Sequence, residues 1–376
     1  MIRRLLFTAG WLWEWLQDHL FAPHPASDVF YVSGRYLYDN GGRKIVLRGV
    51  NLPLLDDWGF PAEDKLTEIE KTGANAVRLQ WYISYPARPV YTAGDLDCTL
   101  DKCRLLRMIP ILMLADFTST TAMGPLNDTV VPWWLSPDIK RVLVRHQRYL
   151  IVNLANELGG YRWVGGDAAS LAAAALAYKE AYKTAITSIR AAGLRMPIMI
   201  DAPDGGTAID VFTSIGAELV NHDPLHSVLL SVHGYWASYD GTPQVDAAFN
   251  ANLPIVFGEI ANKQDESVNG QTQYCYYDLD GTAVSGHTTS TGFRYQQLLL
   301  TLTQLEVGWL AWSWTDDSCA SRRITPDGAY TGAIDGSPTG LTPYGEDIVN
   351  NATYGIRLGY IATQRSASLP GAPPPP

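Results

Sequence analysis

Short apolar runs alternate with longer amphipathic segments along most of the chain. The apolar runs have the length of buried strands, and we expect them to end near Asn51, Gln80, Asp116, Glu157, Asp201, His233, Glu259 and Trp314. Helical patterns fall between them at residues 61–71, 95–107, 137–147, 167–192, 206–215, 244–251 and 293–306. Eight strand-helix units without a large insertion predict an α/β fold, a (β/α)8 TIM barrel. A doubly wound sheet would need a phosphate-binding glycine loop after the first strand, and the sequence has none there.

The flanking segments differ from the barrel pattern. Residues 30–38 and 43–51 are strand-like runs around Asn40-Gly41, which predicts a short N-terminal β-hairpin whose second run continues into the first barrel strand. Residues 1–28 start with basic and apolar residues but then carry acids and tryptophans, so they are interpreted as a signal-like or amphipathic segment. The barrel is assigned to residues 29–363 and a proline-rich tail to residues 364–376.

The composition describes a globular protein with excess acidic charge. The net charge is −10 and no basic run extends beyond Arg322-Arg323, which argues against a nucleic-acid partner. The chain has 12 tryptophans and 20 tyrosines. Aromatic faces suit the flat C–H faces of pyranose rings, although most single tryptophans are expected to be packing residues. A neutral carbohydrate therefore fits better than a charged polymer, and neither an obligate protein partner nor an oligomer is implied.

The four cysteines allow two disulfides without requiring them. We favour Cys275 with Cys319, because each follows a late strand and adjacent loops on one barrel face would bring them together. Cys98 and Cys103 lie five positions apart at a helix start, where a bridge would need an irregular helix. No Cys/His cluster predicts zinc, and neither a metal nor another cofactor is expected.

Polar residues gather where the apolar runs end: Arg78, Asp116, Asn156, Glu157, Asp201, His233, Tyr235 and Glu259. The site of a TIM barrel lies at the carboxyl ends of its strands, so these side chains are expected around one mouth. A buried polar ring is costly unless its members bind one another or a ligand. The pattern therefore predicts a functional site.

The two glutamates of this set predict the chemistry. Glycoside hydrolysis needs one carboxyl group that protonates the leaving oxygen and another that attacks the sugar or activates water. We interpret Glu157 as the general acid/base and Glu259 as the nucleophile, with Asn156 donating to the sugar 2-hydroxyl. Strand alternation is expected to aim Asn156 and Glu157 at different parts of the substrate. Arg78 and Tyr235 are expected to keep Glu259 ionised by lowering its pKa.

The remaining candidates have weaker signals. His233 shares a face with Tyr235 and can contact a glutamate or the substrate. Trp312 and Trp314 share a face of the last strand, and Trp312 is favoured as the floor beneath the cleaved sugar. Trp163 follows a strand end and is a further aromatic candidate. Asp116 is a substrate-binding candidate that could instead only cap a turn.

Several of these motifs resemble glycoside hydrolase family 5, a family of retaining glycosidases, over about residues 30–360. The resemblance rests on Asn156-Glu157, His233-Gly-Tyr235, Gly258-Glu259 and the run from Gly308 to Trp314, together with Gly73 to Arg78. Within the family the runs 131–136, 151–157, 198–203 and 308–314 resemble bacterial β-1,4-mannanases. The resemblance implies a covalent glycosyl-enzyme on Glu259, acid/base work by Glu157 and no cofactor.

Two departures from the family pattern bear on the substrate. The third strand ends in Ala115-Asp116 where family members usually carry a histidine, and Leu158 to Trp163 replaces a Trp-Tyr-Gly type run. The leading hypothesis is a retaining endo-β-1,4-glycanase that hydrolyses β-mannan. The alternatives are an endo-β-1,4-glucanase such as a cellulase or lichenase, an exo-acting β-glycosidase, a non-catalytic carbohydrate-binding barrel, and a metal-dependent hydrolase using Asp116, Asp201, His233 and Glu259.

A polysaccharide too large to import must be met outside the cytoplasm. The protein is therefore expected to be secreted or extracellular, with a periplasmic or membrane-associated location left open by residues 1–28.

Overall fold

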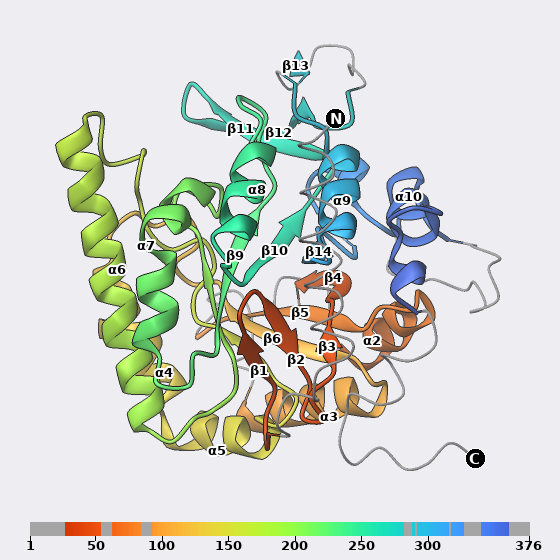
Figure 1. Cartoon of the computed structure of the whole chain (residues 1–376). Coiled ribbons are helices and arrows are strands. Elements are labelled where there is room, and N and C mark those ends of the chain that lie inside the picture. Colours follow the sequence, from red (N-terminus) through yellow and green to blue (C-terminus); the bar gives the residue numbers. More distant parts are fainter. Residues whose placement is uncertain are drawn as a thin grey trace, which may run out of the picture.

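The computed structural model describes residues 27–53, 62–83, 92–281, 288–289, 292–315, 317–326 and 340–360. Within them, parallel strands close into a barrel in the order β10-β14-β4-β5-β6-β7-β8-β9. These strands are β4 (Arg48–Pro53), β5 (Ala76–Trp81), β6 (Ile109–Leu114), β7 (Ile151–Asn153), β8 (Ile198–Asp201), β9 (Val228–His233), β10 (Ile255–Ile260) and β14 (Gly308–Ala311). The predicted (β/α)8 barrel is confirmed (Figure 1).

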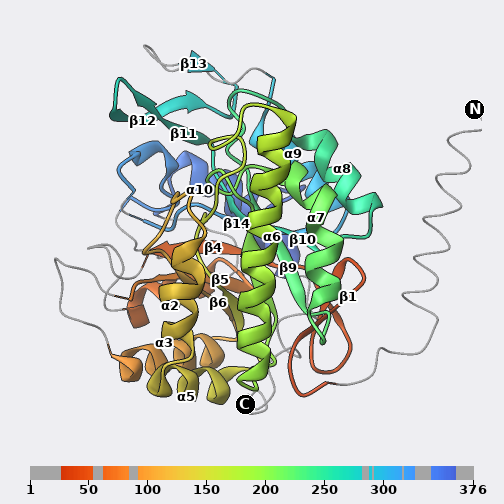
Figure 2. The same cartoon turned by 90° about the vertical axis from the view of Figure 1, so that its left-hand side faces the viewer.

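Helices surround this barrel, and Figure 2 shows the longest, α6, beside α7 on one flank. They are α2 (Ala62–Lys71), α3 (Ala93–Leu105), α5 (Pro137–His146), α6 (Ala168–Ala191), α7 (Ile209–His222), α8 (Thr242–Asn250) and α9 (Tyr295–Gln304). A capping box of Asp167 with Ser170 begins α6, and Gly193 with φ +84° follows its end. The predicted ranges agree within a few residues, except that α7 runs seven residues beyond the predicted end at 215.

A small antiparallel sheet closes the amino end of the barrel. It contains β1 (Tyr31–Ser33), β2 (Tyr36–Tyr38) and β3 (Lys44–Ile45). The first predicted run therefore folds back on itself, at a turn where Gly34 has φ +57°. Its apolar side chains join residues of the barrel interior in one buried cluster: Phe30, Val32, Leu37, Ile45, Leu47, Ala76, Ile109, Ile111, Tyr149, Ile151, Met199, Leu229, Val256 and Leu310. The lower barrel interior is thus apolar and sealed.

A second small sheet rises above β10 at the other end (Figure 1). It contains β11 (Lys263–Val268), β12 (Gln271–Asp278) and β13 (Thr288–Thr289), and β11 and β12 pair as an antiparallel hairpin. A disulfide between Cys275 and Cys319 ties this hairpin to the segment after β14, which confirms the favoured pairing. Cys98 and Cys103 on α3 are free thiols.

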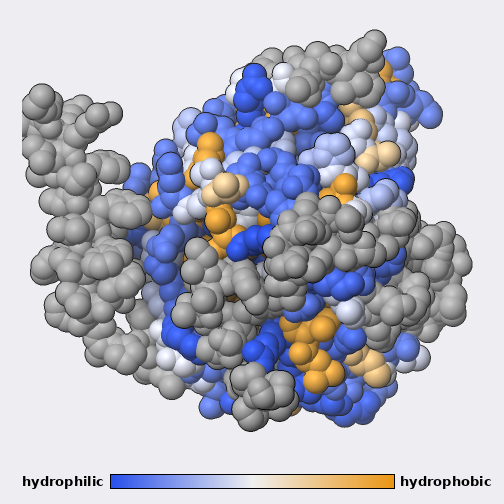
Figure 3. Space-filling model, turned by 90° about the vertical axis from the view of Figure 1, so that its right-hand side faces the viewer, coloured by the Kyte–Doolittle hydropathy of each residue, from blue (hydrophilic) through white to orange (hydrophobic). Residues whose placement is uncertain are grey.

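Several elements were not predicted from the sequence. They are the β11–β12 hairpin, the π-helical turn η1 (Leu126–Val130) with α4 (Val131–Trp134), the 3₁₀ turns η2 (Ala320–Arg322) and η3 (Ile356–Tyr360), and α10 (Pro343–Asn350). In the described part of the chain no helix is both long enough and apolar enough to span a bilayer. The face in Figure 3 is mainly hydrophilic, with separate hydrophobic patches. Except for residues 27 and 28, the predicted segments at 1–28 and 364–376 lie outside the described residues.

Candidate active site

A cleft of about 1000 Å³ opens at the carboxyl ends of the barrel strands. Its lining includes Ala115, Ser119, Asn156, Glu157, Arg162, Trp163, Asp204, Gly205, Tyr235, Tyr239, Glu259, Gln264, Asp265, Glu266, Trp312 and Arg322. Both predicted catalytic glutamates therefore face the same cleft, as the strand-end rule requires. One wall comes from the segment after β7 and another from the β11–β12 hairpin.

Glu259 lies near the end of β10 and is 4% exposed. The register with β9 shifts between Phe257 and Glu259, and such an irregularity re-aims a side chain. Gly258 permits this close packing, because a Cβ there would stand 2.4 Å from the Ser231 hydroxyl oxygen. The Glu259 carboxylate accepts hydrogen bonds from Arg78 and from the Tyr235 hydroxyl, each at 2.8 Å. The predicted neighbours of Glu259 are therefore in place.

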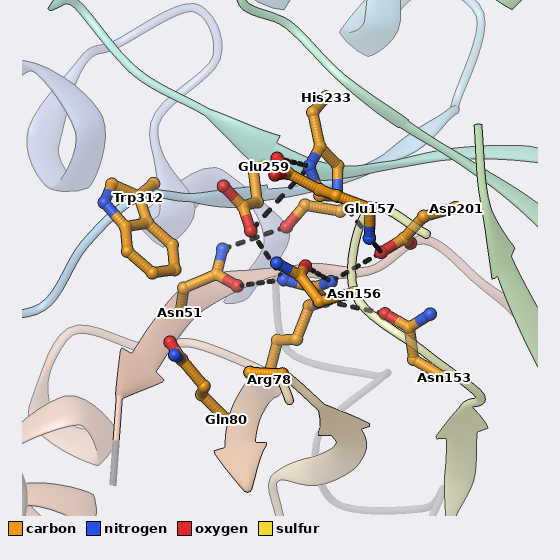
Figure 4. Close-up of polar contacts among 12 residues, drawn as sticks. Asn51, Arg78, Gln80, Asn153, Asn156, Glu157, Asp201, His233, Glu259 and Trp312 are labelled. Atoms are coloured by element: carbon orange, nitrogen blue, oxygen red, sulfur yellow. Dashed lines mark hydrogen bonds and ion pairs between the residues drawn. The ribbon is translucent and has the colours of Figure 1, made fainter. Parts of the chain in front are cut away.

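Arg78 on β5 is fully buried and lies beneath Glu259 (Figure 4). A guanidinium has five N–H groups in a fixed fork. Its nitrogens donate to five side chains on different strands and loops: Asn153 at 2.9 Å, Asn51 at 3.0 Å, Glu259 at 2.8 Å, Asn156 at 2.7 Å and Asp201 at 2.9 Å. Arg78 is outside the lining of the cleft, so the structure gives no support for grouping it with the substrate-binding side chains. It fixes the residues that do line the cleft.

Glu157 is placed by a bend in the chain. Strand β7 ends at Asn153, and Glu157 follows in an irregular segment with φ +50°. The prediction that strand alternation orients Asn156 and Glu157 is therefore wrong. The backbone N–H of Glu157 donates to Asp201 at 3.2 Å, and its carboxylate accepts from the Ser119 hydroxyl at 3.1 Å. Tertiary hydrogen bonds hold this acid where strand geometry does not.

His233 at the end of β9 lies against the acids. Its Nδ1 lies 2.8 Å from Glu157 Oε1 and 3.8 Å from Glu259 Oε1, and its Nε2 lies 3.6 Å from Asp201 Oδ2. The ring is fully buried and outside the cleft lining, and of its two expected contacts the one with a glutamate is present. Burial alone would lower the pKa of His233, but the carboxylates of Glu259 and Asp201 outweigh it and raise that pKa to about 10.

The surroundings shift the pKa values of Asp201 and Glu259 in opposite directions. For Asp201, burial raises the pKa, but Arg78 and His233 outweigh it, so the pKa lies below its ordinary value. For Glu259, burial is the largest effect and raises the pKa, although His233, Arg78 and the Tyr235 hydrogen bond oppose it. The expected net lowering of the Glu259 pKa is therefore wrong. These three groups limit the rise in the Glu259 pKa that burial causes.

The two glutamates stand close together. A carboxylate oxygen of Glu157, one of Glu259 and a ring nitrogen of His233 all lie within 4.8 Å of one another. Retaining glycosidases hold their two carboxyl groups about 5–5.5 Å apart, whereas inverting enzymes leave room for a water between them. Three such ligands could also hold a metal, but the Arg78 guanidinium already contributes a positive charge to Glu259 here.

Asn156 and Trp312 both line the cleft. Asn156 accepts from Arg78 and donates to the Thr118 hydroxyl at 3.1 Å, which leaves its amide with a second N–H. The indole N–H of Trp312 donates to Asp317. In Figure 4 Trp312 lies on one side of Glu259 and Glu157 on the other. The ring is therefore placed as an apolar surface beside the acids.

Two predicted substrate contacts lie elsewhere. Trp314 is fully buried in the core and does not line the cleft, because β14 ends at Ala311 and the alternation that would align it with Trp312 does not extend that far. Asp116 is outside the cleft lining and accepts from the backbone N–H of Ile83 at 2.8 Å. Trp163, in contrast, lines the cleft and is 55% exposed.

Sequence reasoning gave no role to several polar residues that the structure brings to the site: Asn51, Asn153, Thr118, Ser119, Asp204, Asp317 and Arg322. Asn51 ends an apolar run, so the strand-end rule contained a signal for it, as it did for Asp201, which was expected at the mouth and contacts Arg78 there. Those on loops carry no periodic pattern, and only tertiary contacts identify them.

The fold and the paired carboxylates define a barrel of the glycosidase type. A model of the family "Cellulase (glycosyl hydrolase family 5)" matches residues 138–318. The chain is 28% identical over 364 residues to a mannan endo-1,4-beta-mannosidase of Cellvibrio japonicus, covering 94% of this chain and 72% of that protein. It is 26% identical over 303 residues to the enzyme of the same name from Salipaludibacillus agaradhaerens, covering 77% and 82%.

Solved structures of similar proteins share the fold. The beta-mannanase from Streptomyces thermolilacinus has a TM-score of 0.66 at 25% identity, covering 88% of this chain and 97% of that one. The beta-mannanase from Thermomonospora fusca has a TM-score of 0.69 at 21% identity, covering 90% and 99%, and shows the shared fold. The chain is therefore similar to glycosyl hydrolase family 5 over residues 138–318, and to mannan endo-1,4-beta-mannosidases over most of its length.

Proposed function

We propose that the protein is a retaining endo-β-1,4-glycanase that hydrolyses β-mannan. The observation that carries the proposal is the spacing of Glu157 and Glu259 in one cleft, with carboxylate oxygens within 4.8 Å. That spacing is nearer to the separation of about 5–5.5 Å in retaining enzymes than to the wider gap of inverting ones, which supports the double displacement. A carbohydrate-binding barrel would have no use for two acids so close, so the pair also supports catalysis over binding alone.

The first step forms a covalent glycosyl-enzyme. An oxygen of Glu259 attacks the anomeric carbon while protonated Glu157 gives its proton to the glycosidic oxygen, so the C–O bond breaks and the leaving chain departs as an alcohol. Tyr235 and Arg78 hold the Glu259 carboxylate in a fixed orientation before the attack. Hydrogen bonds to Arg78 and Thr118 fix the amide of Asn156, and its second N–H is suited to donate to the sugar 2-hydroxyl.

The second step reverses the roles. Glu157, now a carboxylate, takes a proton from water while the water oxygen attacks the anomeric carbon and Glu259 leaves with the electrons of the ester bond. Two displacements at the same carbon retain its configuration. The hydrogen bonds of Glu157 to His233 and Ser119 limit the directions its carboxylate can take during both transfers.

Mannan is the preferred substrate because the relatives with the highest similarity named above are mannanases. An endo-β-1,4-glucanase is the alternative, since Ala115 lines the cleft where the family usually has histidine and the contact to the bound sugar differs accordingly. An exo-acting enzyme is a second alternative, because the β11–β12 hairpin contributes Gln264, Asp265 and Glu266 to the cleft. We further propose that the enzyme meets its polymer outside the cytoplasm.

Variants of the two acids test the mechanism. Glu259→Ala and Glu157→Ala should each lower polysaccharide cleavage by at least about a hundredfold. Azide should then distinguish their roles, because it replaces the nucleophile in Glu259→Ala and gives an inverted product, but replaces water in Glu157→Ala and gives a retained one. Glu266→Gln is the matched control, a carboxylate of the same cleft without a contact to either acid among the described residues. Normal cleavage by either acid variant would refute the assignment.

The substrate is tested with purified protein on mannan, glucomannan, carboxymethyl cellulose and lichenan, scored by new reducing ends. Endo action is expected to lower the viscosity of mannan before much sugar is released. Early release of one short product would favour the exo-acting alternative. Proton NMR of the first product should show the retained anomer, and inversion would overturn the double displacement.

A further inference from the structure

A turn after β7 brings an exposed tryptophan to the edge of the cleft. Trp163 is 55% exposed and lines the cleft, although large aromatic rings in the same molecule, such as Trp309 and Trp236, are fully buried. An exposed ring that has no packing role is expected to meet a ligand. The position of the ring within the cleft indicates which part of the ligand it contacts.

The ring lies next to the predicted acid/base. A Cβ atom added at Gly205 would stand 3.0 Å from Cη2 of the Trp163 indole and 3.9 Å from Oε2 of Glu157. Gly205 has φ +64°, a backbone conformation that suits glycine, and a side chain there would crowd the indole. The indole therefore approaches the acid with only a glycine between them, whereas Trp312 lies beyond Glu259 on the other side (Figure 4).

A buried carboxylate fixes the turn that carries the ring. Asp204 is 1% exposed, and its oxygens accept from the backbone N–H groups of Tyr161 at 2.7 Å, Arg162 at 2.8 Å and Trp163 at 3.3 Å. Hydrogen bonds to a carboxylate are stronger than those between neutral groups. Asp204 itself has φ +57°, a conformation that aspartate and asparagine tolerate better than most residues.

We propose that Asp204 is a positioning residue that holds Trp163 as the stacking surface for the sugar on the leaving-group side of the cleaved bond. The acid/base gives its proton to the leaving oxygen, so the sugar that carries this oxygen must lie beside Glu157, where the indole lies. This inference rests on the proposed function and adds a specificity-determining residue pair to it. Trp312 serves the sugar on the other side of the bond.

The test compares two substrates that differ only on the leaving side. One is a manno-oligosaccharide long enough to place sugars on both sides of the acids. The other is the β-fluoride of mannobiose, whose leaving group is a single atom that cannot stack. If the wild type prefers a glucan, the matching gluco-oligosaccharide and fluoride replace them. For Trp163→Ala we expect kcat/KM to fall about tenfold on the oligosaccharide and to stay within about twofold on the fluoride.

Asp204→Asn preserves the size of the side chain and its tolerated backbone conformation, but turns an N–H donor toward the N–H groups of the turn. We expect the same selective loss on the oligosaccharide. If Asp204 acts through the ring, the double variant with Trp163→Ala should lose no more than Trp163→Ala alone. Asp223→Asn is the matched control, since Asp223 is a buried carboxylate that binds the N–H groups of Leu225 and Ser227 away from the cleft.

Equal losses on both substrates, or additive losses in the double variant, would overturn the inference while leaving the proposed function standing. A wild type that cleaves neither polysaccharide nor fluoride would overturn the proposed function, and this inference with it. An unchanged kcat/KM of Trp163→Ala on the oligosaccharide would show that the ring does not stack on the leaving sugar, and would overturn this inference without affecting the proposed function.

Discussion

The hydroxyl of Tyr235 is predicted to set the acid limit of activity. It donates to Glu259 at 2.8 Å, and this hydrogen bond opposes the rise in the Glu259 pKa that burial causes. Tyr235→Phe removes only that bond. Because the nucleophile must be ionised, a further rise in its pKa leaves more of it protonated at a given acidic pH. Activity should therefore be lost at higher pH than in the wild type.

The size of the effect follows from the bond. Hydrogen bonds to charged groups contribute about 1.5–3 kcal/mol, and about 1.4 kcal/mol corresponds to a factor of ten in the protonation equilibrium. On the acidic side of the profile, kcat/KM of Tyr235→Phe should fall by about ten- to a hundredfold relative to the wild type. Near the plateau the ionised form dominates in both proteins, so the fall there should be smaller.

The assay is a pH profile of kcat/KM on an oligosaccharide, with unfolding followed separately. Tyr239→Phe is the matched control, because Tyr239 lines the same cleft but its hydroxyl donates to the Thr207 carbonyl oxygen at 2.7 Å. Its acid limit should match that of the wild type. The reasoning is refuted if Tyr235→Phe lowers activity equally at all pH values, or if both variants shift the profile alike.

Three further predictions concern stability and are measured by urea unfolding. Asp201→Asn leaves Arg78 without one of its two buried acids and should lower the free energy of unfolding by about 3–5 kcal/mol at pH 7. Because folding lowers the Asp201 pKa, the wild type should lose this advantage as the pH falls below about 4. A stability difference that persists in strong acid would contradict this prediction. The disulfide spans 44 positions, so Cys275→Ser with Cys319→Ser should cost up to about 4 kcal/mol in the chain-entropy account, and reduced wild type should match the variant. Folding raises the pKa of His233 from 6.5 to about 10, so the stability that protonated His233 contributes is complete below about pH 6.5 and is lost as the pH rises toward 10. A His233→Asn variant should lack this alkaline loss of stability. An equally steep loss in both proteins would refute the prediction.

The barrel and the acid pair could be predicted because their signals are local. Each apolar run with a polar end specifies a strand and its carboxyl terminus, and parallel strands bring those ends together. Glu259 followed this rule directly, since it lies within β10. Glu157 was identified correctly as facing the cleft, although for a different reason, because it lies four positions beyond Asn153, where β7 ends.

What the sequence did not predict depends on contacts between distant segments. The sequence suggests that Trp312 and Trp314 share a strand face, but β14 ends at Ala311 and Trp314 is buried in the core. The β11–β12 hairpin has polar, exposed strands without a clear period, so no pattern marked it. Asn153 lies inside an apolar run, and only the buried guanidinium of Arg78 explains an amide there.

The barrel interior is divided into two layers with different tasks. Its lower part is apolar and sealed by the N-terminal sheet, and this part supplies the burial that favours folding. Its upper part is polar and centred on Arg78, whose hydrogen bonds reach four side chains besides the nucleophile. In the proposed mechanism Glu259 becomes an ester and loses its charge, but those four bonds persist. The guanidinium therefore stays in place through the covalent step, and Glu259 returns to the same partners when water releases the sugar.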